Sequence, residues 1–232
     1  MRAAMPSSAE VQQYRSQIVT LTDAAVDDLS ALWAGWSWDD PAAATAAALA
    51  VVPDVVWTYQ DAAAGLAADT YDVWRDQERV PGRFLAAPAA VAVEDQIAAG
   101  VRNAVGPLWT ADPDADAARS LLTGMTTRLV ARGASDTVVE ATRRDERAVG
   151  WSRVARAGAC RFCRMLAGRG GVYRSERSAR FAAHDRCHCV ATPSWDADAP
   201  DMPVVAYVAS QRKQTAADKA RVRAFLDANY PL

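Results

Sequence analysis

The four cysteines and two histidines of this 232-residue chain all lie between residues 160 and 189. This clustering constrains the fold more than any other feature, because thiolates and imidazoles held so close together can meet at one metal ion. In chain order these residues are Cys160, Cys163, His184, Cys187, His188 and Cys189. A C-x-x-C turn brings two sulfurs onto one tight loop, and a second pair about twenty residues later completes a tetrahedral zinc site.

Six residues compete for four ligand positions. Cys160 and Cys163 are the first two expected ligands, because they form the C-x-x-C pair. Cys187 and Cys189 are two residues apart, so in extended chain their side chains share a face and His188 points away. The predicted ligands of a structural Zn²⁺ are Cys160, Cys163, His184, Cys187 and Cys189, and the pattern leaves open which four bind.

Other uses of the cysteines remain as alternatives. Disulfides need an oxidising compartment, and the N-terminus has no apolar segment typical of a secretory signal. A redox C-x-x-C usually opens a helix within a βαβ unit, a pattern that is missing around Cys160. Zinc is therefore the first expectation, ahead of disulfides, redox chemistry and unligated thiols.

Residues 1–157 are predicted to form a helical scaffold or docking region. Ser7 and Glu10 form a capping box, and Asp40-Pro41 is a second helix start. Behind Ser7, apolar residues recur at spacings of three and four, as on one face of a helix. They are Val11, Tyr14, Ile18, Leu21, Ala25, Leu29 and Leu32. No phosphate-binding loop or dinucleotide fingerprint occurs in this region.

Proline and glycine suggest where these helices end. We expect the helix from Pro41 to break or kink at Pro53, followed by a helix over 54–78 and another over 88–105. A helix that starts at Asp112-Pro113-Asp114 is predicted to end at Gly133. Ser135 is then expected to cap a further helix that runs toward Ala157.

Residues 158–232 are predicted to form a small α+β zinc-binding module with a C-terminal helix. Short β-type runs occur at 172–173, 190–192 and 204–208, and Thr215 precedes a final helical pattern. The predicted fold class is therefore mainly α: a helical N-terminal region, 1–157, followed by this module, 158–232.

Charge is distributed unevenly along the chain. Residues 143–188 contain twelve arginines, no lysine and four acids, a net charge of +8, whereas the whole chain carries −2. A basic segment of this kind suits packaged double-stranded DNA or an acidic protein surface, and ordinary solvated helix faces are the alternative. The chain has no run of about 18 uninterrupted apolar residues, so no membrane partner is expected.

The cysteine motif resembles that of a known family. Cys160-x2-Cys163-x2-Leu166-x-Gly168, followed by Phe181-x2-His184-x2-Cys187-x-Cys189-x3-Pro193, is similar to the C-terminal motif of the Mu protein F-like head-morphogenesis proteins of tailed phages. The likeness covers roughly residues 150–195 and is greatest to versions from phages of actinobacteria, often labelled minor capsid protein or capsid maturation protease. One position departs from the family, where arginine is common in place of His188.

The resemblance implies a minor capsid protein of a tailed bacteriophage. Such a protein would be non-enzymatic, would dock on the portal protein or the major capsid protein, and would lie in the head interior or at the portal vertex after assembly in the host cytoplasm. A capsid maturation protease is the second reading, but both histidines lie inside the cysteine cluster and a protease needs a base near its nucleophile. A zinc-containing DNA-binding protein is the third.

Overall fold

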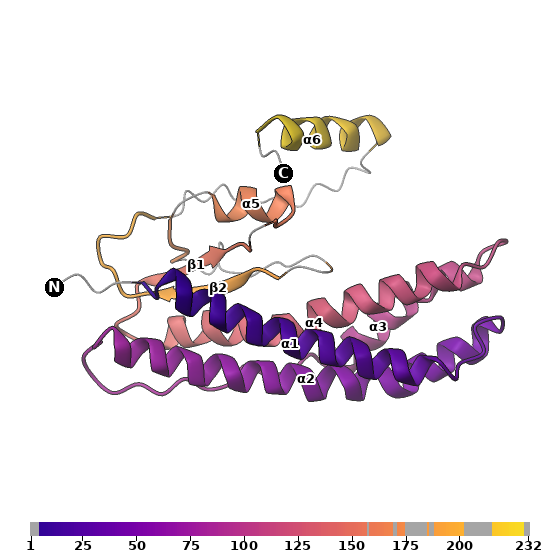
Figure 1. Ribbon diagram of the computed structural model, residues 1–232, viewed down its shortest axis with the longest axis horizontal. Helices are drawn as coiled ribbons and strands as arrows, with labels where there is room; N and C mark the ends of the chain where they lie inside the picture. The colour runs from indigo at the N-terminus through magenta and orange to yellow at the C-terminus, as the bar shows by residue number, and fades with distance from the viewer. Residues whose placement is uncertain are drawn as a thin grey trace.

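The computed structural model describes residues 5–156, 158–168, 171–174, 185, 188–201 and 215–229. The long helices α1 (Ser8–Trp33), α2 (Pro41–Gln77) and α4 (Ala115–Arg144) lie side by side in an elongated layer (Figure 1). α3 (Glu94–Ala104) and the short helix η1 (Gly106–Trp109) pack against α4.

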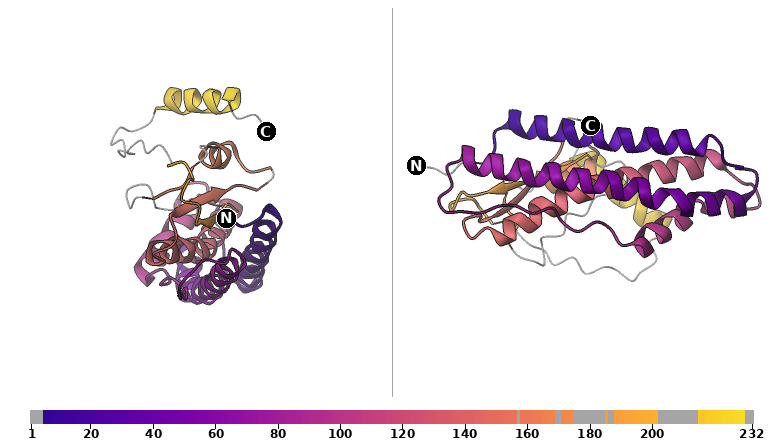
Figure 2. Two further views of the ribbon diagram at one scale, coloured as in Figure 1. Left: turned by 90° about the vertical axis from the view of Figure 1, so that its left-hand side faces the viewer. Right: turned by 90° about the horizontal axis from the view of Figure 1, so that it is seen from below.

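A two-stranded sheet covers one end of this helical layer. Its strands are β1 (Gly150–Val154) and β2 (Val190–Ser194), and both contact α4. α5 (Arg161–Ala167) packs on β1, and α6 (Ala216–Asn229) lies beyond α5, on the side away from the long helices (Figures 1 and 2). The order of the layers is thus helices, sheet, α5 and α6.

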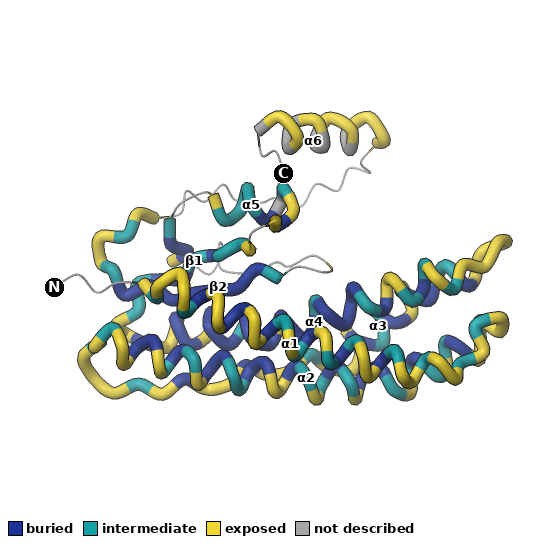
Figure 3. Tube along the Cα trace, in the orientation of Figure 1, coloured by how far each residue is buried: buried dark blue, intermediate teal, exposed yellow. Residues whose placement is uncertain are grey.

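The helix starts predicted from capping residues are confirmed. Ser7 Oγ accepts the Glu10 N–H and Glu10 Oε2 accepts the Ser7 N–H, which is a complete capping box at α1. Asp40 Oδ1 accepts two N–H groups of the first turn of α2, with Pro41 at the first helical position. Most of the apolar stripe of α1 is buried, as Figure 3 shows for the inward faces of the long helices.

Two helix boundaries predicted between residues 53 and 94 are wrong. α2 continues through Pro53, which is buried, because packing against α1, α3 and α4 outweighs one lost backbone hydrogen bond. The helix expected over 88–105 begins only at Glu94. Side chains of α2 and α4 hold the segment before it in extended form, since they accept the N–H groups of Ala86, Ala89 and Ala92.

The predicted end of a helix at Gly133 is also wrong. α4 runs unbroken from Ala115 to Arg144, with Gly133 and Ser135 buried in its interior. A Cβ on Gly133 would lie 2.5 Å from the carbonyl oxygen of Gln60 and 2.7 Å from its Cγ. Glycine is therefore needed at this position for the close approach of α4 to α2, where no side chain fits, and it does not terminate the helix.

The helix predicted from Ser135 toward Ala157 gives way to a strand. α4 ends at Arg144, and β1 pairs antiparallel with β2 in a register that joins Val154 to Val190. The β-type run at 190–192 is confirmed as part of β2, and the run at 172–173 forms isolated bridges to Trp151 and Asp201. The run at 204–208 lies outside the described residues. The predicted final helix is confirmed as α6, directly after Thr215.

One hydrophobic cluster joins the helices to the sheet. It contains residues of α1, α2 and α4 together with Trp151, Cys163, Tyr173, Cys189 and Trp195, so it includes residues on both sides of the predicted boundary at 157/158. A second cluster fills the other end of the helical layer. The division into two domains therefore stays a prediction, and the sheet shares its core with the helices.

Among the described residues, one helix has a length and composition that would allow it to cross a membrane. This is α2, with 37 residues. Core helices of soluble proteins meet the same criteria, and α2 packs against α1, α3 and α4. The finding is weak evidence and assigns no membrane partner.

Candidate metal centre

The first two predicted ligands lie at the start of α5. Cys160 is the N-cap residue of this helix, and its Sγ accepts the Cys163 N–H at 3.4 Å. Cys160 is exposed, whereas Cys163 is buried in the hydrophobic cluster that joins helices and sheet. The C-x-x-C segment thus forms a tight turn stabilised by an amide-to-sulfur hydrogen bond, and such bonds are favourable for thiolates at metal sites.

Cys189 reaches the same cluster from the other strand. It precedes β2 directly and is 3% exposed. The register of the sheet places Cys189 across from Ala155, the residue that follows β1. His188, which we did not expect to be a ligand, is half-buried.

The remaining predicted ligands, His184 and Cys187, lie outside the described residues. Within the described part of the chain, no three residues of the kinds His, Cys, Asp and Glu lie close enough together to hold a metal ion. A four-ligand site can therefore contain at most two described ligands, so it would need both His184 and Cys187. The zinc site with Cys160, Cys163, His184, Cys187 and Cys189 therefore remains a prediction.

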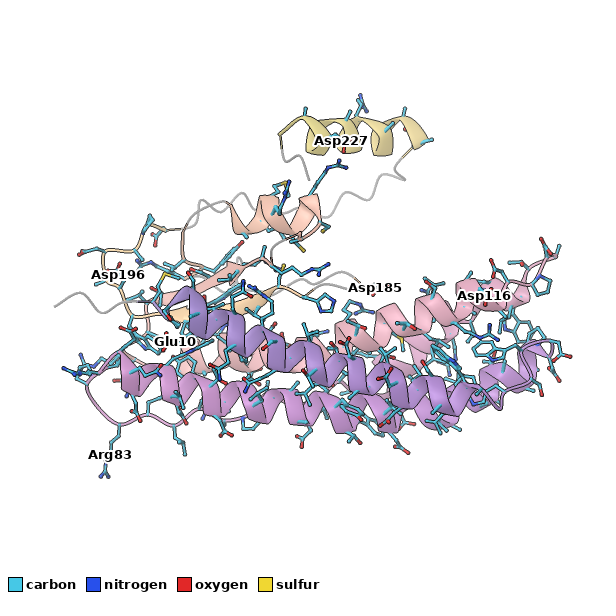
Figure 4. All side chains as sticks on the ribbon, in the orientation of Figure 1. Glu10, Arg83, Asp116, Asp185, Asp196 and Asp227 are labelled. Carbon is cyan, nitrogen blue, oxygen red and sulfur yellow. The ribbon has the colours of Figure 1, made fainter. Side chains whose placement is uncertain are left out.

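Asp185 ties the cysteine–histidine segment to the helical layer. Its Oδ1 accepts a hydrogen bond from Arg128 Nε of α4 at 2.7 Å, and Figure 4 shows Asp185 beside that helix. A Cβ on Gly124 of α4 would lie 3.0 Å from Asp185 Cβ, so this glycine leaves room for the contact. Asp185 thus links the segment that carries His184 and Cys187 to α4.

Arg15 of α1 connects the helical layer to the sheet edge next to Cys189. Its side chain is buried, and its NH2 group donates to the carbonyl oxygens of Val154 and Ala155 at 3.5 and 3.3 Å. Burial lowers the pKa of the Arg15 guanidinium, the nearby Cys189 sulfur raises it, and Arg156 lowers it. Cys189 and Arg15 are therefore electrostatic neighbours, although 173 residues separate them in the chain.

The arginine-rich segment is only partly available to a partner. Arg153 is buried, while Arg161 and Arg174 form ion pairs with Asp227 and Asp201. The exposed arginines among the described residues of this segment are Arg143, Arg144, Arg147, Arg156 and Arg174. They follow the C-terminal end of α4 and the end of β1, so positive charge gathers at the sheet end of the molecule.

The opposite charge lies on the hairpin formed by α1 and α2. No lysine or arginine occurs between Arg15 and Arg75, whereas nine aspartates do. All of these aspartates except the half-buried Asp72 are exposed. The charge separation seen in the sequence is therefore a separation between the helical hairpin and the sheet end.

Comparison with known proteins identifies the family. The model of the VG15 protein family matches residues 5–213, which is most of the chain and includes every predicted ligand. The chain belongs to the VG15 protein family. This is a family of phage proteins, so its setting is the virion or the infected host cell. No curated protein and no solved structure matches the chain.

The VG15 match covers the helical layer and the sheet together, which agrees with their shared core. It supports the phage origin that the cysteine motif implied. It does not by itself distinguish a Mu protein F-like head-morphogenesis protein from other phage proteins.

One buried group in this VG15 chain was not predicted from the sequence. Asp145, the C-cap residue of α4, is 3% exposed, and its Oδ2 accepts hydrogen bonds from Tyr71, Arg75 and Trp195. Burial alone would raise the pKa of Asp145, but hydrogen bonds from Trp195, Arg75 and the Arg147 N–H hold it below the ordinary value. Its partners come from α2 and the end of β2, so no local pattern could reveal the site.

Proposed function

We propose that this chain is a non-enzymatic minor capsid protein of a tailed bacteriophage, which acts in head assembly and carries a structural zinc site. The observation that carries the proposal is the VG15 family match over residues 5–213, combined with the spacing of the cysteine motif inside it. The long helical layer would serve as a docking scaffold on the portal or capsid protein. The sheet end would hold the predicted zinc.

The distribution of charge supports a protein that contacts two kinds of partner. The hairpin of α1 and α2 carries nine aspartates and no basic residue between Arg15 and Arg75, while exposed arginines gather at the sheet end. Packaged DNA would be attracted to the basic end and repelled by the hairpin. We therefore propose that the hairpin contacts protein and that the arginine-rich segment 143–186 contacts DNA or an acidic portal surface.

The residues present are of the kinds that bind zinc, because four cysteines and two histidines supply sulfur and nitrogen donors. In addition, the turn that joins Cys160 and Cys163 is formed. A bound structural zinc would add folding free energy to the small module around it. Catalysis is not needed to explain these residues, since the histidines lie within the predicted ligand set.

The virion role has a direct test. Mass spectrometry of purified phage particles and of immature heads should detect the protein in few copies, and it should co-purify with the portal protein. The major capsid protein gives an internal standard for the copy number. If the protein is absent from both kinds of particle and does not associate with the portal, the proposal is wrong.

The zinc site has an independent test. Native mass spectrometry of the intact chain is expected to show the mass of one zinc ion, which a chelator removes together with the fold of the sheet end. Cys160→Ser should reduce zinc retention without disturbing the core, because Cys160 is exposed, and His188→Ala is the matched control that should retain the metal. A mass lower by about two or four hydrogens, with no metal, would instead show disulfides.

A further inference from the structure

The segment 84–93, which leads from the loop after α2 to the start of α3, contains no polar side chain. It runs in extended form along the helical layer (Figures 1 and 2). The N–H groups of Ala86, Ala89 and Ala92 donate to side chains of α2 and α4 at 3.0, 2.9 and 2.8 Å. These three attachment points are three residues apart, which is the repeat of a polyproline II helix. One residue in three therefore turns toward the helices, and most of the others face outward.

The outward residues of the segment 84–93 form an exposed apolar surface. Leu85 is 77% exposed, the largest value for a large apolar side chain among the described residues, and Val93 and Val91 are 61% and 36% exposed. Exposed apolar residues are common when scattered singly, whereas several gathered together on a soluble protein mark a surface of interaction. The other exposed residues of the segment are Ala87, Pro88 and Ala90.

Opposite charges lie at the two ends of this apolar surface. Arg83 directly precedes the segment, Glu94 and Asp95 directly follow it, and all three are exposed. Figure 4 shows the Arg83 side chain pointing away from the helices. A second copy that runs in the opposite direction would bring each positive end beside a negative end, whereas a parallel copy would bring like charges together.

The apolar side chains also match their own reversal. Arg83 lies five residues before Pro88 and Glu94 lies six residues after it, so a two-fold axis beside Pro88 brings these two charges opposite each other. The same axis places Leu85 of one copy between the exposed Val91 and Val93 of the other. Nucleic acid does not suit this surface, because the segment has no cation of its own and ends in two carboxylates.

We propose that the segment 84–93 is a self-association surface, on which two copies of this chain pair antiparallel about a two-fold axis. Arg83 of each copy would lie beside Glu94 and Asp95 of the other, with the apolar side chains packed between these charged ends. The proposal depends neither on the zinc site nor on the virion role. A stable interface uses about 20–30 residues from each partner, so a surface of this size predicts a weak dimer that forms as the concentration rises.

The first test measures the mass of the full-length chain by sedimentation over a range of concentrations. A reducing agent is present, so that disulfide-linked dimers do not contribute. The wild-type mass should rise from that of one chain toward that of two. Leu85→Glu should raise the concentration needed for dimers by about tenfold or more, because it puts a charge into the apolar contact.

Leu32→Glu is the matched control for Leu85→Glu. Leu32 is 44% exposed and lies in the last turn of α1, outside the segment 84–93. The same charge is introduced at an exposed leucine, so the dimerisation of this variant should equal that of the wild-type chain. An equal loss in both variants would show a general effect of added charge and overturn the proposal.

The second test exchanges the charges at the two ends of the segment. Arg83→Glu puts like charges opposite each other in a dimer, and so does the double variant Glu94→Lys with Asp95→Lys. Each of these chains alone should dimerise less than wild type. An equimolar mixture should dimerise again, because both ends of the mixed dimer then pair opposite charges. This recovery also shows that the variant chains are folded.

Three results would overturn the proposal. The wild-type chain would remain a monomer at every concentration, which would leave the apolar surface to a different partner. It would form dimers that Leu85→Glu and both charge variants leave unchanged, which would place the contact on another surface. Finally, a mixture of the two charge variants that dimerises no more than either chain alone would contradict the antiparallel arrangement.

Discussion

Replacing Asp145 with alanine is expected to destabilise the protein by about 3–5 kcal/mol, because it leaves the Arg75 guanidinium buried without its counter-ion. Asp145 Oδ2 accepts hydrogen bonds from Tyr71, Arg75 and Trp195 at 3.2, 3.0 and 3.0 Å. These donors belong to α2 and to the end of β2, so the substitution also loosens the attachment of the sheet to the helices. Urea unfolding followed by circular dichroism measures the loss.

The matched control is Asp136→Ala, on the same helix. Asp136 forms an ion pair with Arg132 at 2.9 Å, but both side chains are partly exposed to solvent. Exposed pairs of this kind contribute roughly 0.2–1 kcal/mol, so Asp136→Ala should change the free energy of unfolding little. Equal effects of the two substitutions would contradict the role assigned to Asp145.

The low pKa of Asp145 also predicts how stability depends on pH. Because the pKa is lower in the folded state than in the unfolded chain, ionised Asp145 contributes stability at neutral pH. This contribution is lost as the pH falls below the ordinary aspartate pKa of about 4 and through the lower folded value. Asp145→Asn should therefore reduce stability at pH 7 and flatten its decline in acid.

Gly133→Ala should destabilise the protein by about 1–3 kcal/mol or more, despite the better helix propensity of alanine. The new Cβ would be 2.5 Å from the Gln60 carbonyl oxygen, a backbone atom that cannot move without shifting α2. Thermal unfolding of Gly133→Ala, compared with the wild-type chain and with Gly65→Ala, measures the effect.

Gly65→Ala is the same substitution in the interior of α2, where a Cβ meets nothing within 4 Å. It should stabilise the protein by about 0.5–1 kcal/mol, because alanine lowers the entropy of the unfolded chain and favours helix. The two substitutions should therefore have opposite signs. A stabilising Gly133→Ala would mean that α4 and α2 are not so closely packed.

Helix starts were predictable because capping is local. Ser7 with Glu10, and Asp40 with Pro41, satisfy the first N–H groups of α1 and α2 through contacts within three residues. The apolar spacing of α1 likewise identified its buried face, since residues three and four apart share one side of a helix. The C-x-x-C motif at Cys160 and Cys163 could be recognised because the spacing of the two cysteines alone predicts the turn that brings them together.

Other features were decided by contacts between distant parts of the chain. Gly133 does not end a helix. Gln60, 73 residues earlier in the chain, occupies the space that a side chain at position 133 would need. The segment that becomes β1 reads as helix by itself, and it forms a strand because β2 provides its hydrogen-bond partners. Asp145 becomes buried only when Arg75 and Trp195 arrive from elsewhere in the chain.

The sequence by itself thus determined the mainly helical class, the capped helix starts and the cluster of residues with the chemistry of a zinc site. Only the tertiary structure decided that α4 is continuous, that the sheet shares its core with the helices and that Arg15 of α1 bonds to the carbonyl groups at the end of β1. The physical reason is the distance along the chain over which each interaction acts. Capping and helical periodicity depend on neighbours within one or two helical turns. The packing of Gly133 and the charge environment of Cys189 depend on residues that meet only when the chain is folded.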